Sequence, residues 1–398
     1  MSGPELCSRP RGVRRGAALA LVFASVLVTA AATNCLPREQ QRPAALPAGT
    51  AAAALDPRAR HTDRGGDRTA EDVTRAAAEA QADGKSATRA AEEAVGRSGD
   101  RWGAVYDKGQ YEQYTDALDG RYTGVGLWVA RTADGRTQVT RVQSGGPAAR
   151  AGVEAGDFLR SIDHWSADGR PVTEAVSRLR GDAAGSKVVV GLQRGSRSWQ
   201  QTLGRAVLDT EDVAVEELSA KVVVIKVTAF TKGSGERVRA AVREAPKGAG
   251  ILLDLRGNSG GLVGEAVTAA SAFLDGGLVA TYDVHGKQQA LYASDDGEGA
   301  RPLVVLIDGG TMSAAELLTG ALQDRGRAVT VGSRTFGKGS VQMPTGLAGG
   351  SVAELTVGHY RTPSGRGLDG KGITPDLPVT DHPLEHAKTV LSGLGGTS

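Results

Sequence analysis

Residues 302–324 read PLVVLIDGGTMSAAELLTGALQD. The five apolar residues Leu303–Ile307 have the composition of a buried strand, and an Asp-Gly-Gly turn follows them. Beyond the turn, apolar residues recur at helical spacing, which predicts an amphipathic helix beginning near Ser313. A buried strand followed directly by a helix is the repeating unit of α/β proteins, in which helices cover a sheet.

The same alternation begins at Val222 and continues along the second half of the chain. Strand-like and helix-like segments follow one another in the order VVVIKVT, GERVRAAVREA, ILLDL, LVGEAVTAASAFL, LVATYDV, PLVVLI and SAAELLTGALQD. This pattern predicts an α/β core in which helices cover a sheet. We expect residues that carry chemistry in the loops at the strand ends.

A different pattern precedes this core, between Gly120 and about Ala206. Short β-rich runs alternate there with turn signals, and a small barrel-like domain is expected. Pro147 opens a short helix that Gly152 closes, and a longer helix is expected at 172–179. The expected strands are 126–130, 138–142, 158–162, 188–193 and 198–203.

The N-terminus has the layout of an export signal. Residues 11–15 (RGVRR) precede an apolar run at 16–33 (GAALALVFASVLVTAAAT). The run is short for a spanning helix and long for a cleaved signal core, so a removed signal within 1–35 and a retained membrane anchor both stay open. Cys35 would suit a lipoprotein, but the residues before it lack the usual lipidation pattern. The positive charge precedes the run, which predicts that the rest of the chain is secreted or held at the membrane, outside the cytoplasm.

Two further segments separate this signal from the domains. Residues 36–68, rich in Pro, Ala, Arg and Gly without periodicity, suit a flexible linker. The Ala-rich segment at 69–96, broken at Asp83-Gly84, predicts two short helices. The only cysteines, Cys7 and Cys35, lie in or beside the signal, so we expect no disulfide, zinc cluster or thiol nucleophile in the folded part.

Composition gives no reason to expect a nucleic-acid partner. The formal net charge is +2, and the arginines are spread along the chain. Nucleic-acid-binding proteins usually concentrate basic residues on one face, and single-strand binders add aromatic stacking platforms. Aromatic residues make up only 4% of this chain, so such platforms are not expected.

A serine at the start of a helix is well placed to attack a carbonyl group. Ser313 lies where the unpaired amides and the positive end of the predicted helix stabilise an oxyanion. This arrangement is similar to a nucleophile elbow, although the G-x-S-x-G spelling is absent. The alternative is that Ser313 is only an N-cap, a common position for serine. The segment alone leaves both interpretations open.

A serine nucleophile needs a base, and none of the six histidines has a suitable setting in the sequence. Lys338 is the alternative, because burial can lower the pKa of a lysine until the neutral amine accepts the serine proton. If residues 338–342 are extended, Gln342 lies on the same face and can orient the amine. A solvated loop lysine is the other interpretation of Lys338.

The segment around this lysine, GSRTFGKGSVQ at 332–342, also approaches a phosphate-binding loop in spelling. Such a loop needs Ser or Thr directly after the lysine and a helix whose amides cradle the phosphates. Gly339 follows the lysine instead, and residues 340–344 read as a short strand ended by Pro344. We therefore expect no nucleotide cofactor.

A third segment, ILLDLRGN at 251–258, precedes the glycine-rich residues 259–261. Glycines after a buried strand let backbone amides approach a substrate oxygen. Gly260 or Gly261 would supply one oxyanion donor and Ala314 the other. The acidic and basic residues of ILLDLRGN are expected to pin the loop rather than to take part in catalysis.

Together these motifs resemble the carboxy-terminal processing proteases, also called tail-specific proteases, a serine peptidase family with a Ser/Lys dyad. The resemblance implies that Ser313 is the nucleophile, Lys338 the base and Gln342 the residue that positions it, with no metal or cofactor. It covers about residues 100–385. The matching stretches are DLRGNSGGL, TMSAAELLTGALQD, VGSRTFGKGSVQ, HYRTPSGRGLDGKGITPDLPV and, as a helical lead-in, DRWGAVYDKGQYEQYTDALDGRYTGVGL.

The resemblance also implies a domain order. A crotonase/ClpP-like protease core would hold an inserted PDZ domain, whose carboxylate-binding loop would be Gly124, Val125, Gly126 and Leu127. Such loops hold the terminal carboxylate of a peptide, and the adjoining strand pairs with it. In the family this domain also gates the catalytic site. The implied segments are an N-terminal helical segment at 69–118, the PDZ domain at 119–206, the protease domain at 207–385 and a C-terminal tail at 386–398.

Two functions follow as hypotheses. The first is an exported endopeptidase that binds the exposed C-terminal tails of protein or peptide substrates and cleaves them through an acyl-enzyme. The second is a catalytically inactive PDZ adaptor that only binds such tails. The second is motivated by Met312 and Ala315, which replace residues common around the family's serine, and by Ser259, where the family often has proline.

Overall fold

The computed structural model describes residues 65–394 apart from residues 182, 285 and 286. The expected export segment at 1–35 lies outside the described residues, as does most of the linker expected at 36–68. Within the described part, no helix combines the length and the apolar character needed to cross a membrane.

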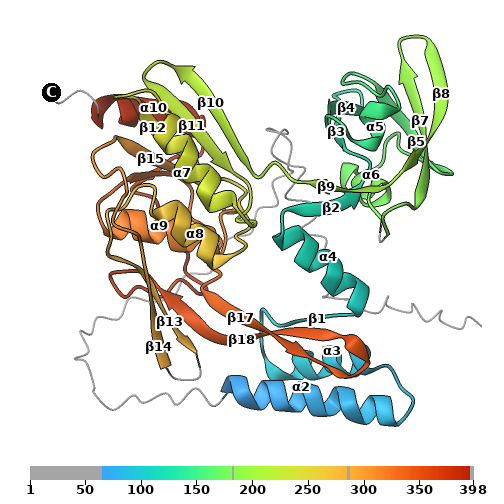
Figure 1. The fold of residues 1–398 in the computed structure, drawn as a ribbon, viewed down its shortest axis with the longest axis horizontal. Helices are drawn as coiled ribbons and strands as arrows, with labels where there is room; N and C mark the ends of the chain where they lie inside the picture. Colours follow the sequence, from blue (N-terminus) through green and yellow to red (C-terminus); the bar gives the residue numbers. More distant parts are fainter. Residues whose placement is uncertain (1–64, 182, 285–286, 395–398) are drawn as a thin grey trace, which may run out of the picture.

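A six-stranded sheet forms the centre of the α/β core, as the sequence predicts (Figure 1). Its order is β10-β11-β12-β15-β16-β19, in which neighbours from β11 to β19 are parallel and β10 is antiparallel to β11. Because β12, β15 and β16 are parallel neighbours, the loops that follow them leave the same edge of the sheet. The six strands span Val213–Ser219, Val222–Val227, Gly250–Asp254, Leu303–Ile307, Val329–Gly332 and Leu377–Pro378.

Helices bury both faces of this sheet. Ile251 and Leu253 of β12 pack in the cluster that holds α7, α8 and α9, whereas Leu252 packs with Ala387 and Leu391 of α10 on the opposite face. This alternation explains why the strands are apolar throughout, since successive side chains enter different cores. The helices α7, α8, α9 and α10 span Ser234–Glu244, Val263–Ala270, Ala314–Asp324 and Pro383–Leu394.

The end of the chain differs from the expectation. Residues 386–398 were expected to form a tail, but helix α10 runs to Leu394 and packs on the sheet. Ala387 and Leu391, four residues apart, lie on one helix face and are both buried. The tail prediction was therefore wrong as far as residue 394, and residues 395–398 lie outside the described part.

A second sheet beside the core carries the N-terminal helices (Figure 1). Its order is β1-β18-β13-β14, and β17 pairs with β18 as well. Ala104 of β1 pairs with Glu354 of β18, so the segment expected to be helical at 69–118 also supplies a strand to a sheet formed from the protease region. Strands β1, β13, β14, β17 and β18 span Ala104–Tyr106, Leu278–Val284, Lys287–Tyr292, Ser340–Gly346 and Val352–Arg361, and the 3-10 turn η2 spans Ala348–Gly350.

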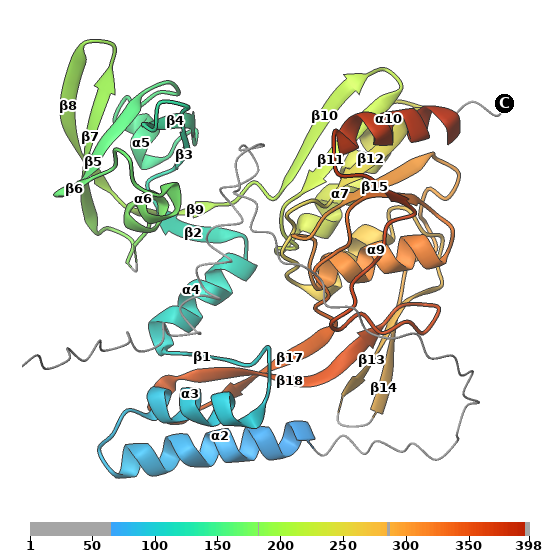
Figure 2. The same ribbon diagram turned by 180° about the vertical axis from the view of Figure 1, so that it is seen from behind.

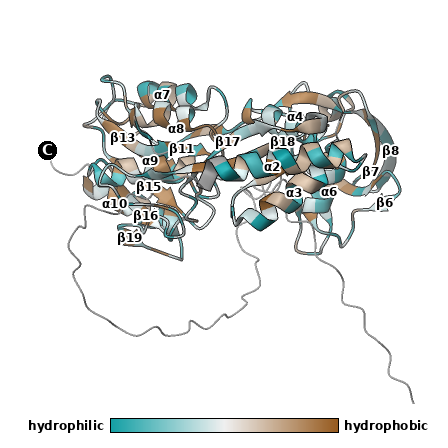
Figure 3. Ribbon diagram, turned by 90° about the horizontal axis from the view of Figure 1, so that it is seen from below, coloured by the Kyte–Doolittle hydropathy of each residue, from teal (hydrophilic) through white to brown (hydrophobic). Residues whose placement is uncertain are grey.

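The two predicted N-terminal helices are confirmed. Helix α2 spans Gly65–Ala82 and α3 spans Ala87–Ser98, on either side of the predicted break. Their ribbons alternate between hydrophilic and hydrophobic residues in Figure 3. Val73, Ala91 and Leu355 belong to one buried cluster, so these helices pack on the second sheet rather than on each other alone.

Strand β17 continues past the proline that was expected to end it. Pro344 pairs with Glu354 inside the ladder, and the strand reaches Gly346. In the described part of the chain, β17 pairs with β18 alone. An edge strand tolerates proline because some of its N–H groups have no ladder partner, which explains why the local signal was misleading.

A small lobe, residues 121–209, lies to one side of the core (Figure 2). Its sheet has the order β3-β4-β5-β7-β8, with β6 paired to β5. Each of the five predicted strands is found within one residue of its predicted bounds. Strands β3 to β8 span Leu127–Arg131, Thr137–Val142, Phe158–Ile162, Trp165–Ser166, Lys187–Arg194 and Arg197–Gly204, and helices α5 and α6 span Pro147–Arg150 and Val172–Leu179.

The small lobe is joined to the rest by two paired strands and one helix (Figure 2). Strand β2 (Arg121–Gly124) enters the lobe and pairs with β9 (Ala206–Asp209), which leaves it. Helix α4 (Lys108–Leu118) leads from β1 to β2. Beyond β9, the fully buried Asp212 accepts a hydrogen bond from the Thr231 hydroxyl at 2.7 Å, which fastens this connection to the core.

Candidate active site

Three loops at one edge of the parallel sheet carry the predicted catalytic residues. Gly260 and Gly261 follow β12, Ser313 follows β15, and Lys338 follows β16. Because these strands are neighbours, segments that are far apart in sequence meet at this edge. The sheet therefore brings the serine, lysine and glycine segments into one region.

The backbone of Ser313 adopts an unusual conformation, with φ 56° and ψ −117°. Residues with a side chain seldom adopt it, and a cost of about 1–3 kcal/mol persists only where the surroundings fix it. Helix α9 begins at the next residue, Ala314, as the sequence predicts. A strained serine between a strand and a helix is the geometry of a nucleophile elbow.

A single buried carboxylate, that of Glu316, joins the serine and lysine segments. Its Oε2 accepts the N–H of Ser313 at 2.9 Å and the N–H of Lys338 at 2.8 Å. Its Oε1 accepts the Thr335 hydroxyl at 2.5 Å and the Gly337 N–H at 2.8 Å. The Glu316 side chain is fully buried, and hydrogen bonds to a charged acceptor are about twice as strong as neutral ones. Glu316 therefore fixes the distance between the two backbone segments.

Gly260 packs directly against the serine. A Cβ at this position would lie 2.8 Å from the carbonyl oxygen of Met312 and 2.9 Å from Ser313 Cβ, so only glycine fits. The Gly260 N–H donates to Asn258 Oδ1 at 2.8 Å. Asn258 is itself fully buried, and its backbone carbonyl oxygen accepts the Met312 N–H at 2.8 Å. The glycine loop and the serine turn thus hold each other in place.

The predicted oxyanion donors differ in their availability. The Gly260 N–H is occupied by Asn258. The N–H groups of Gly261 and Ala314 donate no hydrogen bond to any described residue. Ala314 is the first residue of α9, where an N–H has no partner within the helix. Of the three predicted donors, Gly261 and Ala314 are therefore the two that can receive a substrate oxygen.

Charged residues pin the neighbouring loops. Arg256 donates to both carboxylate oxygens of Asp254, from Nε at 2.7 Å and from Nη2 at 2.6 Å. Asp308 Oδ1 accepts the N–H groups of Gly257 at 2.9 Å and Gly310 at 2.8 Å, which connects the loops after β12 and β15. These contacts agree with the pinning role expected for the charged residues of the ILLDLRGN segment.

The amine of Lys338 has a different environment from its backbone. Within the described part, Nζ makes no hydrogen bond or ion pair, including none to Ser313 Oγ. The atom lies 5.5 Å from the centre of the Trp102 indole ring. The lysine is half-buried, so it is not the solvated loop residue of the alternative interpretation.

Burial lowers the pKa of the Lys338 amine, and the carboxylates of Glu354, Asp100 and Asp369 oppose this effect by favouring the charged form. The loss of water is the larger effect, so the pKa falls below the usual value for lysine. Burial raises the pKa of Glu354, while Lys338 counteracts that rise. A serine protease that uses lysine as its base needs this shift, because only the neutral amine accepts a proton.

Gln342 forms no hydrogen bond with Lys338. Its amide donates to the Ser340 hydroxyl at 2.6 Å and to the Thr356 hydroxyl at 3.4 Å. Ser340 and Gln342 share a face of β17 as expected, but the strand begins at Ser340, so Lys338 lies before it and the assumed alternation does not extend to the lysine. The positioning role of Gln342 stays a prediction, without a hydrogen bond to support it.

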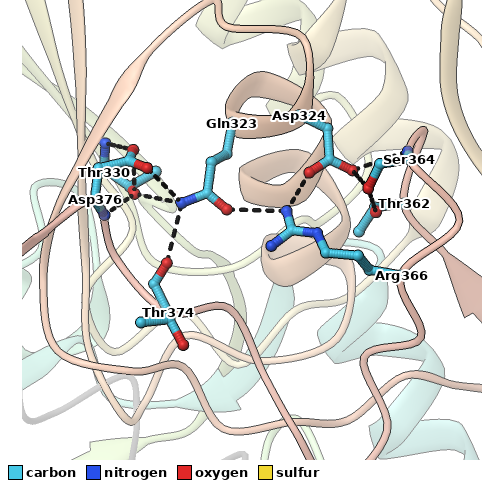
Figure 4. Close-up of polar contacts among 8 residues, drawn as sticks. All are labelled: Gln323, Asp324, Thr330, Thr362, Ser364, Arg366, Thr374 and Asp376. Carbon is cyan, nitrogen blue, oxygen red and sulfur yellow. Dashed lines mark hydrogen bonds and ion pairs between the residues drawn. The ribbon is translucent and has the colours of Figure 1, made fainter. Parts of the chain in front are cut away.

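The loop after β18, residues 362–376, supports the lysine segment from the other side. The N–H of Thr335 donates to the Ile373 carbonyl at 3.1 Å, and the Gly339 N–H donates to Asp369 at 3.2 Å. Figure 4 shows how the end of α9 holds this loop. The contacts join Gln323 and Asp324 to Thr330, Thr362, Ser364, Arg366, Thr374 and Asp376.

A second candidate site lies on the small lobe. A cavity of about 360 Å³ is lined by the predicted carboxylate-binding residues Gly124, Val125, Gly126 and Leu127, by α6 and by residues of the core. The N–H groups of Val125 and Gly126 donate no hydrogen bond to any described residue. Strand β3 is at the edge of its sheet, so its free side can accept another strand. No cluster of metal-ligating side chains occurs in the described ranges.

Arg180 supplies a positive charge to this cavity. It follows α6 and lies over the Tyr122 ring, with 5.1 Å between the guanidinium carbon and the ring centre. Its side chain forms no ion pair or hydrogen bond with described residues. Burial lowers the pKa of Arg180, and Tyr122 opposes this. A desolvated cation beside free N–H groups is suited to binding a carboxylate.

Several residues of the site were not identified from the sequence. Glu316 had a usable signal, since Ser313-Ala-Ala-Glu316 has the spacing of a capping box. Asn258 could have been noted only as a polar residue after a buried strand. Trp102 and Arg180 carry no local signal, because their partners lie elsewhere in the chain.

Comparisons with known proteins agree with this organisation. Residues 221–379 match the profile of peptidase family S41, and residues 138–194 match the profile of the PDZ domain. The chain is 33% identical over 282 residues to the carboxy-terminal-processing protease of Bartonella bacilliformis, an overlap of 68% of this chain and 64% of that protein. It is 31% identical over 310 residues to the carboxy-terminal processing protease CtpA of Bacillus subtilis, an overlap of 75% and 66%.

A solved structure of the S41 family from Bacteroides fragilis NCTC 9343 has a similar fold. Its TM-score is 0.50 at 15% sequence identity, over 74% of this chain and 87% of that one. The aligned part of the chain spans less than two thirds of the length of the two curated relatives. Its family profile, its relatives and the order of its motifs agree, and the chain belongs to peptidase family S41, with a PDZ domain.

Proposed function

We propose that this chain is a serine-type endopeptidase that processes proteins near their C-termini. The observation that carries the proposal is the Glu316 carboxylate, which accepts N–H bonds from both Ser313 and Lys338. It joins the candidate nucleophile to the candidate base beside the free N–H groups of Gly261 and Ala314. Membership of peptidase family S41 and the names of the curated relatives support the same activity.

In the proposed reaction, Ser313 Oγ attacks a peptide carbonyl carbon while its proton passes to the neutral Lys338 amine. The N–H groups of Gly261 and Ala314 bind the oxyanion. The C–N bond then breaks, the departing amine takes the proton from Lys338, and an ester remains on Ser313. A water molecule gives a proton to Lys338 and attacks the ester, and the serine oxygen leaves with that proton. The first and the last of these proton transfers require Lys338 Nζ to reach Ser313 Oγ during turnover.

The cavity on the PDZ domain would hold the substrate tail. Its free N–H groups at Val125 and Gly126 and the cation of Arg180 suit a terminal carboxylate, and β3 offers an open edge to an extended peptide. Residues of the protease core, including Lys226, line the same cavity. This shared lining supports a route by which a bound tail acts on the catalytic region.

Cleavage of casein and of a protein with an unstructured tail tests the mechanism. We expect Ser313→Ala and Lys338→Ala each to lower kcat/KM by about 10³-fold or more, because each removes one half of a unit that moves the proton. Lys388→Ala, which changes a partly exposed lysine on α10 far from these loops in the sequence, is the matched control. Full activity in either active-site variant would refute the Ser/Lys mechanism.

Binding of fluorescent peptides tests the tail site. We expect Arg180→Ala to weaken binding of a peptide with a free C-terminal carboxylate by about 10-fold. An amidated peptide should bind weakly to both forms. Arg178→Ala, which removes a neighbouring surface cation paired with Glu174, should leave the affinity unchanged. Tail binding without cleavage across varied substrates would instead favour the inactive adaptor.

We also propose that the protein acts outside the cytoplasm. The support is the basic stretch at 11–15 followed by the apolar run at 16–33. Cell fractionation combined with mapping of the mature N-terminus would separate a cleaved signal from a retained anchor. Recovery of the intact chain from the cytoplasm alone would overturn this part of the proposal.

A further inference from the structure

The turn between α3 and β1 lies over the amine of Lys338. Trp102 is in this turn, and its ring centre is 5.5 Å from Lys338 Nζ. The same ring packs on Phe336, two residues before the lysine, with ring centres 5.7 Å apart. A residue from the N-terminal segment thus forms one wall of the lysine site.

Asp100 holds this turn in shape and fastens it to β18. Its Oδ1 accepts the N–H groups of Trp102 at 3.0 Å and Gly103 at 2.9 Å. The same carboxylate accepts the N–H and the hydroxyl of Thr356, both at 2.8 Å. Two hydrogen bonds therefore hold the shape of the turn, and two set its position relative to β18.

Asp369 fastens the indole ring to the lysine segment. Its Oδ1 accepts the Trp102 Nε1–H at 3.1 Å and the N–H of Gly339, the residue after the lysine, at 3.2 Å. Trp102 therefore has a fixed edge as well as a fixed backbone. Its ring face, rather than a hydrogen bond, is what the structure offers to Lys338 Nζ.

We propose that Trp102 is a positioning residue for the base: its ring sets where the Lys338 amine lies and keeps water away from it. The inference rests on the proposed Ser/Lys mechanism. A lysine side chain with no hydrogen bond has many accessible rotamers, and an aromatic face restricts them by contact and by cation–π attraction. Without that wall, the amine would reach Ser313 less often and would be better hydrated.

The charges around the amine decide the direction of the effect. Glu354 from β18, Asp100 from the turn and Asp369 from the loop at 362–376 all favour the protonated amine, and burial opposes them. Arg101 is a further charged residue at this ring, and its guanidinium carbon lies 4.5 Å from the Trp102 ring centre. Removing the indole admits water while the three carboxylates remain. The amine should then stay protonated up to a higher pH.

Glu354 also faces tyrosines from β1 and α4, so their protonation must be considered. Burial and Glu354 raise the pKa of Tyr106 to about 12, and burial and Glu354 also raise the pKa of Tyr111 and Tyr114. These phenols stay neutral across the pH range in which a protease is assayed. A change in the acidic limb of the rate profile therefore reports on the lysine and the carboxylates rather than on the tyrosines.

The test is kcat/KM against pH for the full chain with one tailed protein substrate. In Trp102→Ala we expect the acidic limb to move upward by about one pH unit and the rate to fall about 10-fold more at pH 7 than at pH 9, with KM little changed. Trp102→Phe keeps a ring face but lacks the Nε1–H, and it should restore the position of the limb. Trp199→Ala, which removes an indole of the PDZ domain, is the control and should leave the limb in place.

An equal loss of rate at every pH in Trp102→Ala would show a purely structural role and overturn the inference. A rise in activity would overturn it too, since the ring would then be restraining the lysine. If Trp102→Ala fails to fold, Trp102→Leu keeps apolar volume without a ring face, and an unmoved limb in that variant has the same meaning. Loss of cleavage in Ser313→Ala beside an unmoved limb in Trp102→Ala would uphold the proposed function and sink this inference alone.

Discussion

The serine and the lysine of this site are held in opposite ways. The backbone of Ser313 is strained, and Glu316, Asn258 and Gly260 fix the turn around it through hydrogen bonds and a close contact. The Lys338 backbone shares the same anchor at Glu316, but its amine has only an aromatic face and distant carboxylates around it. The local fold fixes the candidate nucleophile, whereas the position of the candidate base depends on residues from other parts of the chain.

This difference indicates where the activity can be adjusted. A strained turn that is fixed from several sides cannot move without breaking hydrogen bonds, which makes it a poor switch. An amine without a hydrogen bond can be moved at little cost by changes in the segments that cover it. We therefore expect substitutions around Ser313 and substitutions around Lys338 to differ in the size and in the type of their effects.

The largest effect is expected at Glu316, which accepts hydrogen bonds from both the serine segment and the lysine segment. In Glu316→Gln the amide offers one acceptor oxygen where the carboxylate has two, and it places an NH2 group against N–H donors. We expect loss of about 3 kcal/mol in the free energy of unfolding and at least a 10³-fold loss in kcat. Urea unfolding measures the free energy of unfolding, and single-turnover cleavage measures the rate.

The control for this prediction is Glu385→Gln, which changes an exposed glutamate on α10. It should leave both quantities within error, because exposed pairs contribute little. A Glu316→Gln variant with normal turnover would show that the two backbone segments keep their separation without the carboxylate. Glu316 would then not be what fixes the serine turn, and the proposed difference between a fixed serine and a movable lysine side chain would have no structural support.

The next effect belongs to the serine half alone. In Gly260→Ala the new Cβ would meet Met312 O at 2.8 Å and Ser313 Cβ at 2.9 Å, and the residue has φ +92°. We expect kcat to fall about 100-fold, because a shift of the serine turn misplaces the nucleophile. Gly257→Ala separates strain from contact, since Gly257 has φ +71° and open space around its Cβ position.

Stopped-flow acylation of the two variants at equal concentration gives the comparison. Gly257→Ala should lose stability through its positive φ but keep most of its acylation rate. Equal rates in the two variants would mean that the contact between Gly260 and Ser313 does not position the nucleophile.

The smallest effect concerns the loop at 362–376 on the lysine half. Burial raises the pKa of Asp324, but hydrogen bonds from Ser364 and Thr362 and the charge of Arg366 lower it further, so the net shift is downward. The carboxylate therefore stabilises the fold above the unfolded pKa of about 3.9, and this contribution is lost as the pH falls through the lower folded value. At pH 7, Asp324→Asn should lower the free energy of unfolding by about 1 kcal/mol.

Urea unfolding at pH 7 and near pH 2 checks this expectation. The difference in unfolding free energy between the parent and Asp324→Asn should be smaller at the lower pH, because the carboxylate loses its stabilising charge as the pH falls through its folded pKa. Asp72→Asn, in an exposed pair with Arg75, serves as the control with a near-zero difference. If the difference in unfolding free energy between the parent and Asp324→Asn does not change with pH, the carboxylate charge is not the origin of that difference.

Elements that bury their own apolar residues were predictable from sequence. Helix α6 has the bounds Val172–Leu179 given by its periodicity, and α9 begins just after Ser313 as its turn indicates. The sequence also places Gly260 and Gly261 directly after a buried strand, where they are found. In each case the signal and the structure lie within the same short segment, so local pattern was sufficient.

Features that depend on distant partners were not predictable. Strand β1 has only three residues, and its partner β18 lies near the other end of the described chain. The contact of Trp102 with Lys338 follows from that pairing, and no local pattern contains it. The hydrogen bond expected between Gln342 and Lys338 is not found, because β17 begins at Ser340 and the extended conformation assumed for residues 338–342 does not include the lysine.

The pairing of Ala104 with Glu354 has a consequence for the order of events during synthesis. The turn carrying Trp102 leaves the ribosome early, but the strand on which it docks is made near the end of translation. A nascent polypeptide therefore has its serine before it has the wall around its lysine. The proposed peptidase activity would then appear only after the last strands are made, and an incomplete chain would not cleave neighbouring proteins.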